Sequence, residues 1–302
     1  MASSKQAQGQ KSSTPLRLGT LGLAQPNFRQ TLSAFRAQVI KQLIVMKRYP
    51  IAFFTSFAMI FLILVIFILA ATLFSPTNGT GIGMSSGVVA GTMTYGFILF
   101  MFTSDSFWTI GTSLRQEQYQ GTLESLFLTP ANKFTDLISR ITIIVVWTGL
   151  NCIAALILIG VITTELPLEN LGESLIVLAF TLSGTFGIGF FMAGLSVRLK
   201  ESSQLLANIS QFVFLILCAM FFPFRALPGL VLWVSRLIPL SYGVDLFRST
   251  IMGFPTGYPE LASAQTEWLI VPSFGVLMPL MGFFFFRWTI FRQRAKSGLS
   301  DY

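Results

Sequence analysis

The chain has 302 residues, of which 53% are hydrophobic and only 11% are charged, and its net charge is +8. Soluble domains carry about a quarter charged residues, so this composition indicates a protein that crosses a membrane several times. The absence of histidine excludes a Ser-His-Asp triad and an H-E-x-x-H zinc site. The two cysteines, Cys152 and Cys218, lie in apolar runs. We expect them to pack as small side chains, with neither a disulfide nor a metal site.

Two predicted elements precede the first apolar run. Residues 1–27 are rich in Ser, Gln, Gly and Thr and lack the apolar core of a signal peptide, which predicts a disordered cytoplasmic tail. Residues 28–50 place apolar side chains at helical spacing with cations on the other faces, which predicts an amphipathic helix in the headgroup plane. This helix either anchors the first span or acts as a lever to a cytoplasmic partner, and the two roles are compatible.

Six apolar runs follow, each near the about 20 residues that a crossing helix needs. They predict an all-α membrane protein with six transmembrane helices, at about residues 51–74, 88–114, 138–162, 175–199, 205–222 and 269–291. Residues 296–302 are predicted to form a cytoplasmic tail. Small residues let helix backbones approach closely, and the fourth run contains Gly184, Gly187, Gly189 and Gly194.

The second run carries Asp105, the one acid that we expect inside a span. An ionisable residue at membrane depth is costly and is by default a functional candidate. It lies about ten residues from the cytoplasmic end of its run, roughly 15 Å at helical rise. Two roles remain open for it, structural pairing with a polar partner and a direct role in transport.

Residues 223–268 are apolar but are interrupted by Pro223, Pro228, Pro239 and Gly243. The pieces between these residues are too short to cross a membrane. We expect short re-entrant or interfacial helices packed on protein, where their backbone groups can be satisfied.

The orientation follows from the cations. All of the 20 lysines and arginines except Arg225, Arg236 and Arg248 fall on the side that holds both termini. Cytoplasmic segments carry the excess of Lys and Arg, so both termini and residues 115–137 are predicted to be cytoplasmic. This distribution explains the basic balance without nucleic acid.

Three features resemble the membrane subunits of ABC-2 type ABC transporters that export drugs, lipids or polysaccharides. The first is RQEQYQGTLESLFLTP at 115–130, the second is FFPFRALPGLVLWVSRLIPLSYGVDLFR at 221–248, and the third is the amphipathic helix before the first span. Together with the six spans, the resemblance covers roughly residues 28–295 and makes 51–295 the transmembrane domain. It implies two six-span subunits, a homodimer by preference, paired with two cytoplasmic ATPase subunits.

The resemblance makes 115–130 a coupling helix that docks into a groove of the ATPase. Gly121 would break the preceding helix, Thr122 would cap the next turn, and Glu124 would lie near that helix N-terminus. The apolar face would meet the groove, as in other helix-in-groove contacts. The residues assigned to coupling are Glu117, Gly121, Thr122, Leu123, Glu124, Leu126, Phe127, Thr129 and Pro130.

The resemblance also implies that 223–248 forms extracellular re-entrant helices that close the outer end of the pathway. Asp245 and Arg248 lie three residues apart and are expected to be able to pair on one helix face. Such a salt bridge would hold the shape of the segment, and direct substrate contact is the alternative. The pathway or gate candidates are Asp105, Arg225, Arg236, Tyr242, Asp245 and Arg248.

The leading functional hypothesis is ATP-driven export of an amphipathic or lipid-linked substrate across the cell membrane. The chain has no G-x-x-x-x-G-K-[ST] motif, so ATP and Mg²⁺ are expected on the partner subunit and not on this permease subunit, which is not itself an enzyme. A secondary transporter or channel without ATP is the alternative, although it would need ion or proton sites beyond Asp105. An intramembrane enzyme is disfavoured, since no G-x-S-x-G elbow or defensible pair of catalytic carboxylates is found.

Overall fold

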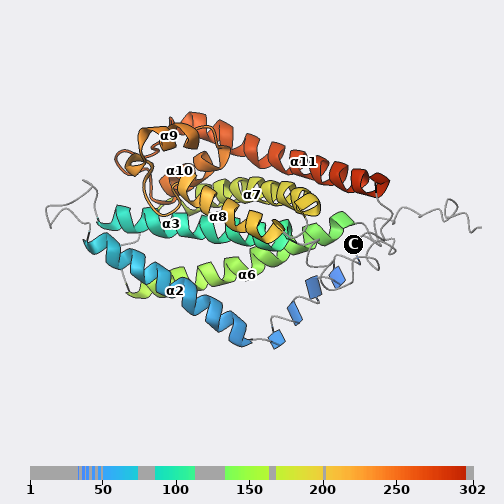
Figure 1. The fold of residues 1–302 in the computed structure, drawn as a ribbon. Coiled ribbons are helices and arrows are strands. Elements are labelled where there is room, and N and C mark those ends of the chain that lie inside the picture. The colour runs from blue at the N-terminus through green and yellow to red at the C-terminus, as the bar shows by residue number, and fades with distance from the viewer. Residues whose placement is uncertain are drawn as a thin grey trace, which may run out of the picture.

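The computed structural model describes residues 50–73, 86–112, 133–162, 168–199 and 202–296, with scattered positions between 33 and 48. Every regular element within these residues is helical, as the sequence predicts (Figure 1). The elements are α2 (Pro50–Leu73), α3 (Ser86–Asp105), the π-helix η2 (Ser106–Gly111), α6 (Lys133–Ile162), α7 (Leu171–Leu199), α8 (Ser203–Leu217), the 3-10 helix η4 (Phe224–Ala226), α9 (Gly229–Ser235), α10 (Pro239–Ile251) and α11 (Ala264–Lys296).

Helices occur at all six predicted places, but not all of them have the length of a span. Four stretches are long and apolar enough to cross a membrane: Gly87–Gly111, Arg140–Ile157, Leu171–Ser196 and Ala264–Ile290. The bent pair α9 and α10, with an angle of 95° between its helices, would make a fifth. Helix α8 at Ser203–Leu217 is shorter, and within the 24-residue helix α2 the stretch Phe54–Ile66 is apolar. The described residues therefore establish a multi-pass helical membrane protein with four or five candidate spans.

The closest helix pairing joins α7 to α11 through small residues. A Cβ at Gly187 would lie 2.4 Å from the Pro279 nitrogen, and a Cβ at Gly282 would lie 2.2 Å from the Gly187 carbonyl oxygen. Ser183 donates a hydrogen bond to the Gly275 carbonyl oxygen across the same contact at 2.7 Å. Close backbone approach between small residues replaces the hydrophobic driving force that lipid removes. The glycines of the fourth run thus lie where the sequence places a helix contact.

The second span is not a uniform α-helix. Its α-helical part ends at Asp105, and the six residues of η2 continue it as a π-helix. The Ser106 hydroxyl donates to the Thr185 carbonyl oxygen of α7 at 3.3 Å, and a Cβ at Gly189 would lie 2.5 Å from the Ser106 hydroxyl. Single π segments inside α-helices are frequent at functional sites, and this one directly follows the acid that the sequence singles out.

The fifth predicted span, 205–222, extends beyond the end of the helix that the structure shows there. Helix α8 stops at Leu217, and residues 218–222 form a turn with Ala219 in the left-handed region at φ 47°. The Met220 amide donates to the Leu215 carbonyl at 3.1 Å and the Ala219 amide to the Ile216 carbonyl at 3.2 Å. These two bonds form a Schellman C-cap, which usually carries glycine at the left-handed position. No helix breaker precedes Pro223, so the sequence pattern alone gives no reason to end the helix five residues early.

Helices α9 and α10 lie at one end of the bundle, beside the start of α11, and α11 finishes at the other end (Figure 1). Near that other end, the Arg198 and Arg292 guanidinium carbons lie 4.6 and 4.4 Å from the centroid of the Trp288 ring. Cation–π contacts of this kind are stabilising, and the one from Arg198 joins the last turn of α7 to α11, whereas that from Arg292 lies within α11. The described positions between 33 and 48 are helical, and Ile40, Leu43 and Ile44 there are exposed.

Candidate functional site

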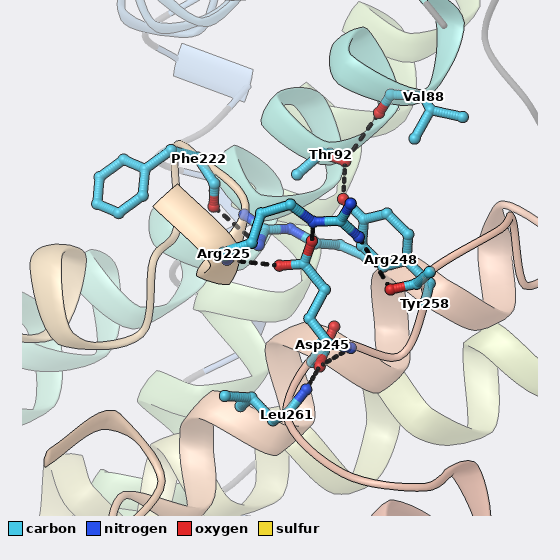
Figure 2. Close-up of polar contacts among 10 residues, drawn as sticks. Val88, Thr92, Phe222, Arg225, Asp245, Arg248, Tyr258 and Leu261 are labelled. Atoms are coloured by element: carbon cyan, nitrogen blue, oxygen red, sulfur yellow. Dashed lines mark hydrogen bonds and ion pairs between the residues drawn. The ribbon is translucent and has the colours of Figure 1, made fainter. Parts of the chain in front are cut away.

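A group of charged and polar residues surrounds α10, and we call it the α10 cluster. It consists of Thr92, Arg225, Asp245, Arg248, Tyr258, Glu260 and Glu267. Figure 2 shows most of these side chains converging between α3, α10 and the loop that leads to α11. Three members, Arg225, Asp245 and Arg248, are residues that the sequence marks as gate candidates.

Arg248 is fully buried and is the largest of the fully buried side chains among the described residues. Its Nη2 donates to the carbonyl oxygens of Ala219 at 2.9 Å and Met220 at 2.8 Å, and its Nη1 donates to that of Phe222 at 3.4 Å. These carbonyls belong to the turn that ends α8. Irregular backbone at membrane depth is tolerated only where its polar groups are satisfied within the protein, and Arg248 supplies those donors.

Gly96 of α3 leaves the space in which this contact forms. A Cβ there would lie 1.9 Å from Arg248 Nη2 and 2.1 Å from the Met220 carbonyl oxygen. The ring of the neighbouring Tyr95 packs edge-on against Phe247, with centroids 6.2 Å apart. Both α10 and the turn that ends α8 therefore pack against α3.

Asp245 binds backbone and not its neighbour in the helix. Its Oδ2 accepts from the amides of Glu260 and Leu261, each at 2.7 Å, as Figure 2 shows. Its Oδ1 is buried and has no hydrogen-bond partner. The predicted pairing of Asp245 with Arg248 is not made, because both side chains bind backbone groups far from them in sequence, and Asp245 Oδ1 and Arg248 Nε are left without a partner.

Arg225 and Glu260 form the exposed edge of the cluster. Arg225 Nε lies 2.6 Å from Glu260 Oε1, and Arg225 Nη2 donates to the Gly257 carbonyl oxygen at 3.0 Å. The Arg225 side chain is 40% exposed and that of Glu260 is 3% exposed. The pair is open to solvent on the Arg225 side only, and it positions the loop before α11.

Tyr258 connects the same loop to α3. Its hydroxyl lies 2.6 Å from Thr92 Oγ1, and Thr92 Oγ1 donates to the Val88 carbonyl oxygen at 2.7 Å. A threonine has one hydroxyl proton, and that proton goes to Val88, so Tyr258 is the donor to Thr92. Burial raises the pKa of Tyr258 to about 12, which keeps the phenol protonated and the bond intact.

The other predicted site residues lie outside the α10 cluster. Tyr242 donates to the Arg236 carbonyl oxygen at 2.9 Å, and the Arg236 side chain is exposed. Asp105 accepts a hydrogen bond from the Thr148 hydroxyl of α6, which fits the structural-pairing alternative. The coupling segment 115–130, with all nine residues assigned to it, lies outside the described residues, so that assignment stays a prediction.

Four members of the cluster are absent from the sequence-based candidates: Thr92, Tyr258, Glu260 and Glu267. Glu267 is fully buried in the first turn of α11, five residues after the Ala262 amide that donates to it at 3.2 Å. Its signal in the sequence is a single acid directly before a long apolar run, at the boundary of a predicted span. The predicted span begins at residue 269, two residues after Glu267, so the prediction left Glu267 in a loop, whereas α11 begins at Ala264.

A comparison with family models identifies residues 33–252 as an ABC-2 type transporter domain. The comparison with curated proteins finds no significant match. The matched region contains α2 to α10 and both sequence motifs, and it ends at the C-terminus of α10. Membrane proteins of this family are transport components that normally work with an ABC ATPase. The chain therefore belongs to the ABC-2 type transporter family, as the membrane-embedded permease component.

Proposed function

We propose that this chain is the membrane-spanning subunit of an ATP-driven exporter. Two copies would form the translocation pathway between them, and each would couple to a separate ATPase subunit that carries ATP and Mg²⁺. The substrate class is amphipathic: a drug, a lipid or a lipid-linked glycan. The observation that carries the proposal is the family match over residues 33–252, which includes the 115–130 segment.

The charge distribution supports the proposed orientation. Arg198 and Arg292 cluster on Trp288 at the end of the bundle opposite α9 and α10. Basic and aromatic residues gather at the cytoplasmic interface of membrane helices. In this proposal that end faces the ATPase, both termini are cytoplasmic, and the protein lies in the cell membrane with six membrane segments, α8 and its buried turn forming the fifth.

The α10 cluster supports a role for α9 and α10 as the outer closure of the pathway. The α8 turn, α10 and the loop before α11 are joined by hydrogen bonds from Arg248 and to Asp245, and the Arg225–Glu260 ion pair closes the loop. These contacts make one rigid unit, which Tyr258 also joins to α3 through Thr92. A rigid unit at the end opposite the coupling segment suits alternating access, in which the ATPase acts at one end and the pathway opens at the other.

The proposal is tested by co-expressing the chain with a candidate ABC ATPase from the same genome. The test variant combines Glu124→Ala with Leu126→Ala, and the matched control in the same segment combines Gln118→Ala with Gln120→Ala. We expect the test variant to lose co-purification of the ATPase, or the stimulation of ATP hydrolysis by transport, while the control keeps both.

Two results would contradict the proposal. If no ATPase co-purifies with the unaltered chain and transport in vesicles follows an ion gradient alone, the protein is a secondary transporter or channel. If the test variant and the control behave alike while ATP-driven transport persists, coupling depends on another segment.

A further inference from the structure

The α10 cluster contains two acids from different helices whose carboxyl groups meet. Asp245 of α10 and Glu267 of α11 are both fully buried. Two successive amides bring their carboxyl groups together, since Leu261 donates to Asp245 at 2.7 Å and Ala262 donates to Glu267 at 3.2 Å. The function proposed for this chain does not use this contact, which depends neither on an ATPase partner nor on the orientation of the protein in the membrane.

Each carboxyl group has one oxygen bound to backbone and one oxygen free. Asp245 Oδ2 accepts from the amides of Glu260 and Leu261, and Glu267 Oε1 accepts from the amide of Ala262. Asp245 Oδ1 and Glu267 Oε2 are buried without a partner. Three successive amides of one loop are thus divided between two carboxyl groups.

Most polar atoms of the surrounding groups are engaged elsewhere, whereas Arg248 Nε is buried without a partner. Arg248 donates to the α8 turn, and Glu260 pairs with Arg225. Tyr258 donates to Thr92, and Tyr242 donates to the Arg236 carbonyl oxygen. Among the described residues, no ion pair within 4.0 Å reaches either Asp245 or Glu267.

Two ionised carboxylates have only acceptor oxygens, so they repel each other and cannot form a hydrogen bond. In a buried site the cost is greater, because water does not screen the charges. One proton converts the contact into an O–H···O⁻ bond, which is short and stronger than a neutral hydrogen bond. A metal ion suits the site less well, since no third acid or thiol among the described residues joins the pair.

We propose that Asp245 and Glu267 bind a single proton between them and that this proton fastens α10 to α11 through the loop at residues 260–262. Removal of the proton leaves two buried anions facing each other. The two carboxyl groups then separate or take up water, and the loop amides lose their hydrogen bonds to one of the two helices. The link is therefore strongest when one proton is bound and weakens as the pH rises.

The shared proton makes the stability of the fold depend on pH. Exposed carboxyl groups of the unfolded chain are ionised at neutral pH, whereas the folded pair keeps one proton. The folded state thus binds more protons than the unfolded state, so the stability contributed by the pair falls with rising pH. Ionisation of Tyr258 does not contribute to this loss of stability below about pH 11, because burial raises the pKa of Tyr258 to about 12.

The first test is infrared difference spectroscopy of the full chain in lipid nanodiscs during a pH titration. We expect a carbonyl-stretch band of a buried protonated carboxylic acid at neutral pH, lost on raising the pH and absent from Glu267→Gln. Persistence of that band in both Glu267→Gln and the reciprocal variant Asp245→Asn would overturn the proposal, as would its absence from the unaltered protein.

The second test compares thermal unfolding midpoints across neutral and alkaline pH. The Glu267→Gln amide can donate to Asp245 without titrating, so we expect its midpoint to fall less with pH than that of the unaltered chain. Glu260→Gln weakens the contacts with Arg225 and removes a negative charge near Asp245, so it should displace the pH profile but keep the fall of the midpoint with pH. Identical profiles for Glu267→Gln and the unaltered chain would refute the shared proton. A midpoint raised by added Na⁺ or Ca²⁺ only while both acids are present would assign the site to a metal cation instead.

Discussion

The guanidinium of Arg248 in α10 holds the carbonyl of Ala219, the residue in left-handed conformation that ends α8, at 2.9 Å. A left-handed non-glycine residue costs roughly 1–2 kcal/mol, and the bonds from Arg248 to this turn offset that cost. The relationship explains why an arginine can be fully buried: its charge is spread over the backbone carbonyls of the turn that ends α8.

Arg248→Met should destabilise the fold by about 3 kcal/mol or more, because the carbonyls of Met220 and Phe222 would lose their donor and that of Ala219 would keep only the Phe222 amide. Thermal unfolding in detergent measures this loss. The matched control is Arg236→Met, which removes an exposed arginine from the end of α9 and should have an effect within about 0.5 kcal/mol. Equal midpoints for the two variants would show that Arg248 does not hold the α8 turn.

Gly96→Ala should destabilise the protein by about 1–3 kcal/mol, the usual cost of overpacking. The added Cβ would overlap both Arg248 Nη2 and the Met220 carbonyl oxygen, and it would drive α10 away from α3. The control is Gly149→Ala in α6, whose nearest neighbour would lie 3.8 Å away. We expect no loss for that control, since alanine is the better helix former. Similar unfolding midpoints for the two variants would contradict the packing described for α3.

Thr92→Val should cost more stability than Tyr258→Phe, although both remove the same hydrogen bond. Valine leaves the buried Tyr258 hydroxyl without a partner, which costs about 1–3 kcal/mol. Phenylalanine leaves Thr92 still bonded to Val88, so its cost is that of one bond, about 1 kcal/mol. The double variant should cost less than the sum of the two. An opposite ranking would mean that the hydroxyl of Thr92, and not that of Tyr258, is the donor between them.

Asp105→Asn should keep ATP-driven transport, because the asparagine carboxamide oxygen can still accept from Thr148. Asp105→Leu, similar in size but without an acceptor, should lower protein yield and stability in parallel with transport. The measurement is substrate uptake into inverted vesicles, normalised to the amount of folded protein. Loss of transport in a stably folded Asp105→Asn variant would instead give the carboxylate a direct part in the transport cycle.

The helices themselves were largely predictable from the sequence, since apolar runs of span length must satisfy their backbone internally. Helix α7 at Leu171–Leu199 and the predicted 175–199 differ mainly at the first turn. The end of α8 was not predictable, because the donor to the carbonyls of its terminal turn is Arg248, about thirty residues later in the chain. Sequence periodicity carries no information about such a distant partner.

The candidate site was predicted in part. Arg225, Asp245 and Arg248 do gather, but the expected contact between Asp245 and Arg248 is replaced by contacts to backbone. Spacing along one helix identifies which side chains share a face, yet it does not identify the loop amides that fold over that face. Glu267 was missed for a related reason, because its importance depends on the loop that precedes it.

The short α8 has a consequence for the surrounding lipid. Its 15 residues extend about 22 Å at helical rise, whereas a typical hydrocarbon core is about 30 Å thick. Leu205, Ile209, Phe212 and Ile216 form an exposed apolar stripe along it. Where acyl chains meet this stripe, the bilayer must thin to match it, at a cost of fractions of a kcal/mol per Å. Phospholipids with shorter acyl chains should therefore gather beside α8, and local membrane thickness becomes a variable to which this transporter responds.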